Sequence, residues 1–222
     1  MKILVIAPHP DDETLGCGGA LLRHQAEGHE VHWVVVTEAH QPQWSSDYIE
    51  KKSVEISAVF DSYKMTSLQE LKFPTTQLDE IPLSKLIDRL REAIDNVRPD
   101  IVYLVHDGDV HTDHHAVFTA TLSVLKTFYM KKWGVKRILS CETLSSTEAA
   151  APQPHRVFIP NVYQDISSYL ERKIEIMATY ETESQPDPFP RGPLAIRGLA
   201  RYRGASIGVD YAEAFMLIRE VF

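Results

Sequence analysis

Residues 2–13, with the sequence KILVIAPHPDDE, give the clearest indication of the fold. The first half, Lys2–Ala7, is an uninterrupted apolar run, which is typical of a strand buried on both faces. The second half is polar and contains two prolines, so it predicts a loop at the end of that strand. A buried strand followed at once by a polar loop is how a parallel α/β sheet begins.

The next segment completes the first unit of this sheet. Residues 14–26 predict a helix, although Gly16, Gly18 and Gly19 weaken it and indicate that other backbone passes close by. Residues 30–37 are rich in valine and predict a second strand. A strand, a loop, a helix and a strand within about 35 residues form a parallel-sheet unit.

Strands and helices continue to alternate along the chain. We expect one domain over residues 1–222, an α/β fold with a doubly wound, mostly parallel sheet and helices on both faces. Residues 65–76 predict only irregular structure or short strands. The other predicted helices are 47–63, 83–97, the segment from Val117 to Leu125, and about 165–180, with a short helix near the end; the other predicted strands are 101–105, 137–141 and 212–218.

Composition narrows the classes of protein that fit. The formal net charge of −8 disfavours general binding of nucleic acid, whose phosphates are also negative. No apolar stretch reaches the length of about 18 residues that a membrane span needs, and the first apolar run is too short for a secretory signal. Cys17 and Cys141 lack the spacing of a zinc site and predict free thiols in a reducing cytoplasm.

Two short polar segments carry the chemistry. HPDDE (residues 9–13) follows the first predicted strand, and HTDH (residues 111–114) follows the strand at 101–105. In doubly wound sheets, binding sites gather beyond the carboxyl ends of the strands. We therefore expect the two segments to meet at one edge of the sheet.

The residue types in these segments suit a metal ion. His9, Asp12 and His114 offer two imidazoles and one carboxylate, and a zinc ion held by such a set keeps an open position for water. The same set also suits Fe²⁺, so the ligands alone do not identify the metal.

Neighbouring residues could take part in a reaction. Asp11 is placed to accept a proton from a bound water, and His111 could stabilise the oxyanion formed when water attacks an amide carbonyl. Asp113 could orient one of the histidines through a hydrogen bond. The simpler alternative is that Asp11, Asp12 or Asp113 only caps a helix and that the histidines are structural.

These segments together resemble the LmbE-like, or PIG-L-type, family of zinc N-deacetylases. The resemblance rests on HPDDE after an amino-terminal strand and on the pattern H-x-D-H-x-x-V from His111 to Val117. The end of the chain agrees, because Lys173, Tyr180 and the Ser184-Gln185 pair, with YAEAF at residues 211–215, are similar to the family's closing segments.

The resemblance implies a Rossmann-like fold and a zinc ion on His9, Asp12 and His114. It further implies that Asp11 is the base and that His111 is the electrophilic partner. Family substrates are commonly N-acetylglucosamine conjugates, and the resemblance favours an assembly of several copies of the chain. We therefore expect a hydrolase that removes an N-acetyl group from a small amino sugar or sugar conjugate, possibly nucleotide-linked.

The chain departs from the family pattern on the second predicted helix, where members often carry a helpful arginine. Here the nearest candidates are Lys51 and Lys52, and a lysine does not reproduce a bidentate guanidinium. Residues 188–209 contain no acidic residue and four arginines, of which Arg191 and Arg197 are candidates for binding an anionic substrate. A solvated helix face or a subunit contact would explain the same pattern.

Other interpretations have less support. The GCGG segment at residues 16–19 does not match a nucleotide-binding glycine loop. Trp44, in a polar loop, could stack on a sugar. A metal-holding carbohydrate-binding or regulatory protein without turnover would not need Asp11. An Fe²⁺ oxygenase would normally use a β-barrel. Three loops, at 40–46, 145–154 and 185–193, would select a substrate. Their sequences do not indicate which substrate this is.

Overall fold

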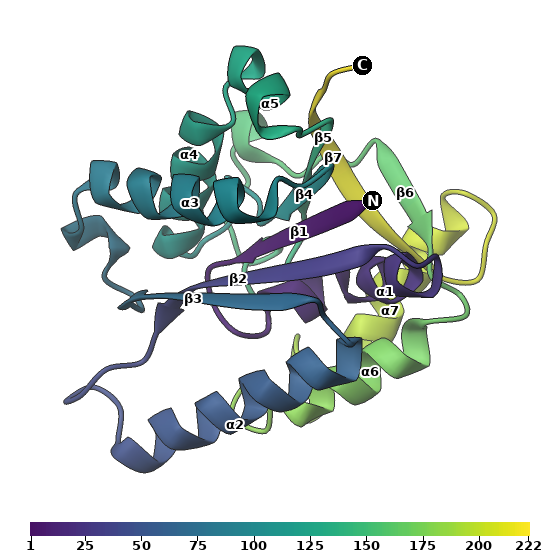
Figure 1. Ribbon diagram of the computed structural model, residues 1–222. Coiled ribbons are helices and arrows are strands. Elements are labelled where there is room, and N and C mark those ends of the chain that lie inside the picture. Colours follow the sequence, from purple (N-terminus) through teal and green to yellow (C-terminus); the bar gives the residue numbers. More distant parts are fainter.

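The computed structural model describes residues 1–222 and contains one seven-stranded sheet (Figure 1). The spatial order of the strands is β3-β2-β1-β4-β5-β7-β6, and the five strands from β3 to β5 are parallel. β7 runs antiparallel to both of its neighbours. The strands are β1 (Lys2–Ala7), β2 (Glu30–Glu38), β3 (Ser67–Pro74), β4 (Ile101–Leu104), β5 (Arg137–Cys141), β6 (Val162–Asp165) and β7 (Ala212–Glu220).

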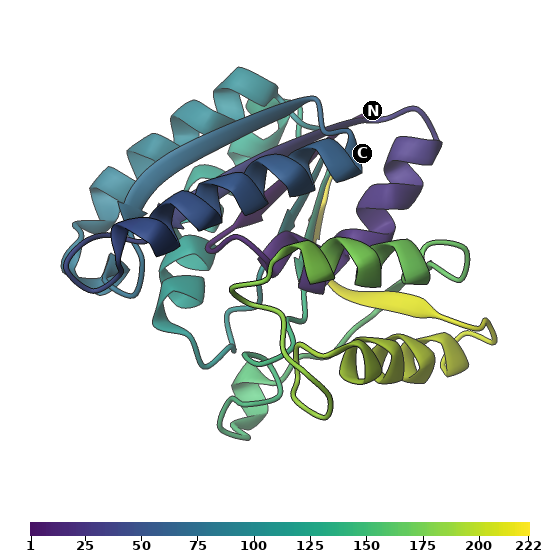
Figure 2. The ribbon, with the colours of Figure 1, turned by 90° about the horizontal axis from the view of Figure 1, so that it is seen from below.

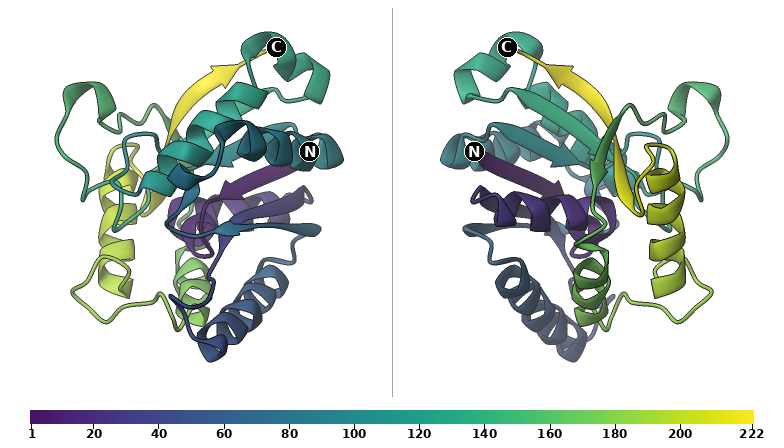
Figure 3. Two further views of the ribbon diagram at one scale, coloured as in Figure 1. Left: turned by 90° about the vertical axis from the view of Figure 1, so that its left-hand side faces the viewer. Right: turned by 90° about the vertical axis from the view of Figure 1, so that its right-hand side faces the viewer.

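Helices cover both faces of the sheet, as expected for a doubly wound fold (Figures 1 and 3). One face carries α1 (Asp12–Ala26), α2 (Ser46–Tyr63), α6 (Leu170–Thr179) and α7 (Pro193–Ala205), which Figure 2 shows from below. The other face carries α3 (Leu83–Val97), α4 (Thr112–Val124) and α5 (Thr127–Trp133). Two short 3₁₀ helices are η1 (Leu78–Glu80) and η2 (Pro154–Arg156). No helix has both the length and the apolar character to cross a membrane.

The alternation of side chains along β1 explains why both faces need helices. Ile3 and Val5 belong to the core beneath α1 and α6, whereas Leu4 and Ile6 belong to the core beneath α3 and α4. Successive side chains of a strand point to opposite faces, so an all-apolar strand must be covered twice. The predicted fold class is confirmed.

α1 is interrupted at Cys17, whose backbone (φ −146°) is not helical. The backbone N–H groups of Gly19 and Ala20 therefore lack partners within the helix, and both donate to the carboxylate of Glu213 on β7, at 2.8 and 2.7 Å. The ammonium group of Lys173 on α6 lies 2.8 Å from the same carboxylate. The closing strand thus caps the second half of the first helix.

The glycines of α1 make room for side chains, and not for backbone as the sequence analysis expected. A Cβ atom at Gly18 would lie 2.5 Å from the Tyr63 hydroxyl oxygen, and one at Gly19 would lie 2.7 Å from Ile166 Cγ2. This close packing accounts for the GCGG segment without a nucleotide. Cys17 and Cys141 are both buried, and neither forms a disulfide bond.

The structure differs from the sequence prediction in four segments, one of which is α5, a helix that was not predicted. Residues 65–76, where irregular structure or short strands were expected, contain one regular strand, β3, which pairs with β2. The strand β6 was not predicted, because Val162–Asp165 is short and not fully buried. The helix expected over 165–180 begins only at Leu170, after β6 and a turn.

Candidate active site

The two polar segments meet at the carboxyl edge of the sheet, because β1 and β4 are adjacent parallel strands. His9 follows β1, and His114 lies in the first turn of α4, which follows β4. Their ring centroids are 5.4 Å apart. The prediction that these segments come together is confirmed.

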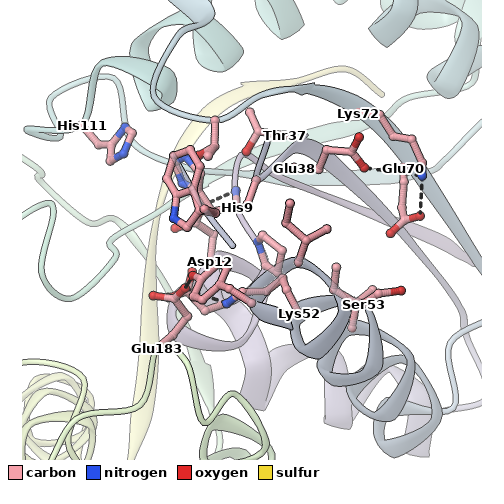
Figure 4. A pocket seen from close by; sticks show the side chains of 18 of the residues that line it. His9, Asp12, Thr37, Glu38, Lys52, Ser53, Glu70, Lys72, His111 and Glu183 are labelled. Carbon is pink, nitrogen blue, oxygen red and sulfur yellow. Dashed lines mark hydrogen bonds and ion pairs between the residues drawn. The ribbon is translucent and has the colours of Figure 1, made fainter. Parts of the chain in front are cut away.

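A large pocket of about 810 Å³ opens over this edge (Figure 4). Its lining comes from the loop after β1, the end of β2, helix α2 and the loops that follow β4 and β5. His9, Asp12, His111 and His114 all lie in that lining. Trp44, half-buried in the loop before α2, lines it as well.

Asp12 lies between the two histidines. One of its carboxylate oxygens is 3.3 Å from His9 Nδ1, and the other is 3.4 Å from His114 Nε2. Two ligands about 2.0–2.2 Å from a tetrahedral zinc ion are themselves about 3.3–3.6 Å apart. Each of the two distances, which involve different oxygens of Asp12, lies in the range expected between two ligands of one tetrahedral ion.

The outer nitrogen of each histidine meets a second carboxylate. His9 Nε2 lies 3.0 Å from Asp113, and His114 Nδ1 lies 2.7 Å from Asp109. When these outer nitrogens carry the protons and donate to the carboxylates, the lone pairs of His9 Nδ1 and His114 Nε2 face Asp12. Metal-binding histidines are commonly oriented in this way.

The charges at the site also favour a cation. Asp12, Asp109 and Asp113 are buried, and none forms an ion pair with a lysine or arginine. Burial by itself would lower the pKa of both imidazoles. Hydrogen bonds with the carboxylates outweigh this effect and raise the pKa of His9 to about 9. The neighbouring carboxylates raise the pKa of His114 to about 10. This preference for positive charge is what a bound metal ion would satisfy.

His111 approaches the same point from the start of α4. Its Nδ1 accepts a hydrogen bond of 3.2 Å from the backbone N–H of Asp113, so the ring caps the helix. The three histidines each have a nitrogen within 4.8 Å of the others. Burial, with the nearby His9 and His114, lowers the pKa of His111 to about 4. The ring is therefore neutral near pH 7 and carries its proton on Nε2, as a donor.

Asp11 occupies the amino-terminal cap position of α1, but its side chain makes no capping hydrogen bond. Its backbone has φ 135°, which costs about 1–3 kcal/mol for a residue other than glycine. The backbone N–H of Asp11 donates to Glu13, which also accepts from the Tyr180 hydroxyl at 2.8 Å. Burial and the Asp12 carboxylate raise the pKa of Asp11 well above its usual range.

Asp113 does not cap its own helix, whose cap is His111. Besides contacting His9, its carboxylate accepts from the backbone N–H groups of Thr76 and Leu78, at 2.7 and 3.2 Å. It therefore ties the loop after β3 to the site.

Of the four basic residues predicted to bind substrate, only two reach the pocket. Lys52 and Arg191 lie in its lining, where both contact Glu183. Lys51 is exposed and pairs with Glu181, and Arg197 pairs with Glu171 on α6. The last two side chains point to carboxylates outside the pocket, so we exclude them from the substrate-binding group.

Arg191 is the basic residue closest to the reacting groups. Its guanidinium lies 3.3 Å from Asp11 and 2.8 Å from Glu183. It thus reaches from the loop before α7 into the pocket, whereas Lys52 reaches it from α2. The remaining arginines of residues 188–209 also have carboxylate partners, Asp210 for Arg201 and Glu142 for Arg203.

Two functional candidates were missed in the sequence. Asp109, five residues before His114, is almost completely buried and accepts a second hydrogen bond of 2.6 Å from Thr147. A carboxylate in the same loop as a candidate ligand was the available signal. Thr143 lines the pocket, is buried, and its hydroxyl oxygen has no hydrogen-bond partner; the sequence held no signal for it.

Comparisons with known proteins agree with this geometry. Residues 4–125 match the family model described as PIG-L, GlcNAc-PI de-N-acetylase. The chain is 31% identical to the uncharacterized deacetylase YaiS of Escherichia coli, over 68% of this chain and 78% of that protein. It is 25% identical to the diacetylchitobiose deacetylase of Thermococcus kodakarensis, over 100% of this chain and 84% of that protein.

A solved structure shows the same fold. The conserved protein TT1542 from Thermus thermophilus superposes with a TM-score of 0.77 at 26% identity, covering 99% of this chain and 96% of that one. Fold, site and relatives define an enzyme of the N-deacetylase class. The chain belongs to the PIG-L family, also called LmbE-like.

Proposed function

We propose that this protein is a zinc-dependent hydrolase that removes the N-acetyl group from a small acetylated amino sugar or its conjugate. The observation that carries the proposal is the position of Asp12 between two histidine nitrogens, each of whose rings is held by a further buried carboxylate. The names of the relatives support an acetylated sugar as the substrate, since one of them acts on diacetylchitobiose.

His9, Asp12 and His114 would hold the ion, with Asp113 and Asp109 orienting the two rings. A bound zinc ion would lower the pKa of a water molecule and polarise the acyl carbonyl. Fe²⁺ fits the same ligands, and metal analysis of the purified protein distinguishes the two.

Two residues of the chain, Asp11 and His111, would transfer the proton and stabilise the developing negative charge. Asp11 accepts a proton from the attacking water as the new carbon–oxygen bond forms at the acetyl carbon. The Nε2–H of His111 donates a hydrogen bond to the carbonyl oxygen as negative charge develops there. When the carbon–nitrogen bond breaks, the proton held by Asp11 passes to the leaving nitrogen, and the products are acetate and an amine.

The placement of Asp11 favours catalysis over a binding or regulatory role without turnover. A protein that only held a metal and a sugar would gain nothing from a strained backbone at Asp11. Such strain is typical of reacting groups, which it holds ready for the reaction. A cytoplasmic location and an assembly of several copies remain predictions of the sequence analysis.

The test is release of acetate and amine in equal amounts from an N-acetylglucosamine disaccharide. Asp11→Asn keeps the shape of the side chain but cannot accept a proton, so we expect turnover to fall about 10²–10⁴-fold with the metal retained. Lys51→Gln, outside the pocket, is the control and should leave turnover unchanged. Absence of acetate release by the wild type, or normal turnover by Asp11→Asn, would refute the proposal.

A further inference from the structure

The pocket has a second end, away from His111, where Glu38, Glu70 and Lys72 gather (Figure 4). The ammonium group of Lys72 lies 3.4 Å from Glu38 and 4.0 Å from Glu70. One cation is therefore shared by two carboxylates. We call these three residues the acidic end of the pocket.

The other cations in the lining are also neutralised. Lys52 lies 2.6 Å from Glu183 and 3.5 Å from Glu55. Arg191 is held between Glu183 and Asp11. Each lysine and arginine of the lining therefore already faces at least one carboxylate, and the unpaired donor among them that the structure shows is Arg191 Nε, which is buried.

The lining as a whole is negative. It contains six carboxylate side chains against three lysine or arginine side chains. The two positive charges of a divalent ion at His9, Asp12 and His114 would offset most of this excess near the ligands and would leave the carboxylates of the acidic end. An anionic ligand is therefore repelled at the acidic end, where two carboxylates share one lysine, and a neutral or cationic ligand is not.

The uncharged part of the lining suits a saccharide. Trp44 and Tyr48 offer aromatic surface, and several Ser and Thr hydroxyls can both donate and accept hydrogen bonds, as sugar hydroxyls do. The buried hydroxyl of Thr143 has no partner within the protein. A volume of about 810 Å³ lies high in the range of about 300–1,000 Å³ for pockets that enclose drug-sized ligands, so it exceeds the needs of one sugar ring.

We propose that the pocket selects an acetylated saccharide of at least two rings whose second ring is uncharged or carries an amine, and that it discriminates against second rings or leaving groups bearing carboxylate or phosphate. The acetylated ring lies at the metal ligands and the second ring extends toward the acidic end. This inference rests on the proposed function. It disfavours the nucleotide-linked substrate considered in the sequence analysis.

Three disaccharides of equal size test the proposal. N-Acetylglucosamine is linked to glucose, to glucosamine or to glucuronic acid, so that only the charge of the second ring changes. We expect kcat/KM for the glucuronic acid compound to be about 5- to 30-fold below that for the glucosamine compound at low salt. The difference should shrink at about 1 M salt, where the screening length is about 3 Å.

A charge-neutralising variant assigns the effect to the acidic end. The double variant Glu38→Gln, Glu70→Gln leaves Lys72 without its partners, and we expect it to abolish or invert the preference. The control is Glu80→Gln, Glu92→Gln, which makes the same change of net charge at exposed positions outside the pocket lining. The control should keep the wild-type preference.

Binding of the three deacetylated products, measured by calorimetry, gives a readout that does not depend on turnover. Weaker binding of the glucuronic acid product supports the inference. Equal or tighter binding of that product, or equal kcat/KM for all three substrates, overturns the inference and leaves the proposed function intact. Failure to release acetate from any of the three overturns the proposed function itself.

Discussion

At the scale of single residues, the site depends on pairs of a histidine and a carboxylate. Asp113 fixes which nitrogen of His9 faces Asp12, and Asp109 does the same for His114. Both carboxylates are almost completely buried, so each contact is made in a medium where electrostatic interactions are strong. The proposed ligands are therefore oriented before any ion binds.

Asp109→Ala removes one of these orienting carboxylates. Loss of such a partner typically lowers metal affinity about 10- to 100-fold, and we expect that range for zinc measured by competition with a chelator. The control is Asp107→Ala, which alters the same loop without touching the contact with His114. Unchanged zinc affinity in Asp109→Ala would show that His114 is not a ligand or needs no orientation.

His111→Ala removes the proposed donor to the oxyanion. Loss of one such donor costs about 2.7–4 kcal/mol in the transition state, so we expect kcat to fall about 10²–10³-fold with KM nearly unchanged and zinc retained. His111→Gln, which keeps an N–H group, should restore part of the activity. Loss of zinc from His111→Ala would instead make His111 a ligand, as the closeness of the three histidines also permits.

At the scale of helices and strands, the meeting of α1, α6 and β7 holds the first half of the molecule to the second. Glu213 accepts from two backbone N–H groups at the break in α1 and pairs with Lys173, and both side chains are buried. The resemblance in the sequence already included Lys173 and the YAEAF strand. The structure shows what those residues do, which is to cap and anchor a broken helix.

Glu213→Ala leaves the buried Lys173 ammonium group without its carboxylate partner and with only the backbone carbonyl of Leu15, 2.9 Å away, as a hydrogen-bond acceptor. Breaking a buried ion pair in this way typically costs about 3–5 kcal/mol, and we expect a loss of that size in the free energy of unfolding by urea. Glu175→Ala, on the exposed side of α6, is the control and should change stability by less than about 1 kcal/mol. A loss below about 1 kcal/mol in Glu213→Ala would contradict this role.

Which elements the sequence predicts follows from their periodicity. Lys2–Ala7 and Leu83–Val97 were placed correctly, because the first is a strong apolar run and the second has a clear helical spacing. β3 was predicted only as irregular structure or short strands and β6 was missed, because an edge strand with exposed side chains has little apolar signal. Their place in the sheet depends on pairing with β2 and β7, which no local pattern encodes.

At the scale of the whole molecule, the topology brings distant residues to one edge. His9 and Asp113 are 104 residues apart in sequence and lie in contact because β1 and β4 pair. That meeting could be predicted from the order of strands and helices. The approach of Arg191 to Asp11 could not, since it depends on the path of the loop before α7. Lys51 and Arg197 were wrongly predicted to bind substrate for the same reason, since the direction of their side chains depends on the folded structure.

Stability should depend on pH through His24, which lies far from the proposed metal ligands. Burial, with the neighbouring His29, lowers its pKa from 6.5 to about 4, while its ring contacts Tyr103 at 2.9 Å. The unfolded chain then binds more protons than the folded one between these values. The stabilisation is full above pH 6.5 and is lost as the pH falls toward 4.

The loss amounts to about 1–3 kcal/mol, from about 1.4 kcal/mol per pH unit. It is measured as the difference between urea unfolding of the metal-free protein at about pH 7.5 and about pH 5. His24→Gln, which cannot be protonated, should show a smaller difference than the wild type, and groups shared by both proteins cancel in the comparison. Equal pH dependence in the two proteins would contradict a depressed pKa for His24.

The dependence of turnover on one metal ion is tested by titrating metal-free protein with zinc while acetate release is recorded. We expect no turnover without metal, a linear rise, and a break at one zinc per chain, with Asp12→Asn showing neither the rise nor the break. Full turnover in metal-free wild type, or a normal titration of Asp12→Asn, would contradict a zinc site built on His9, Asp12 and His114.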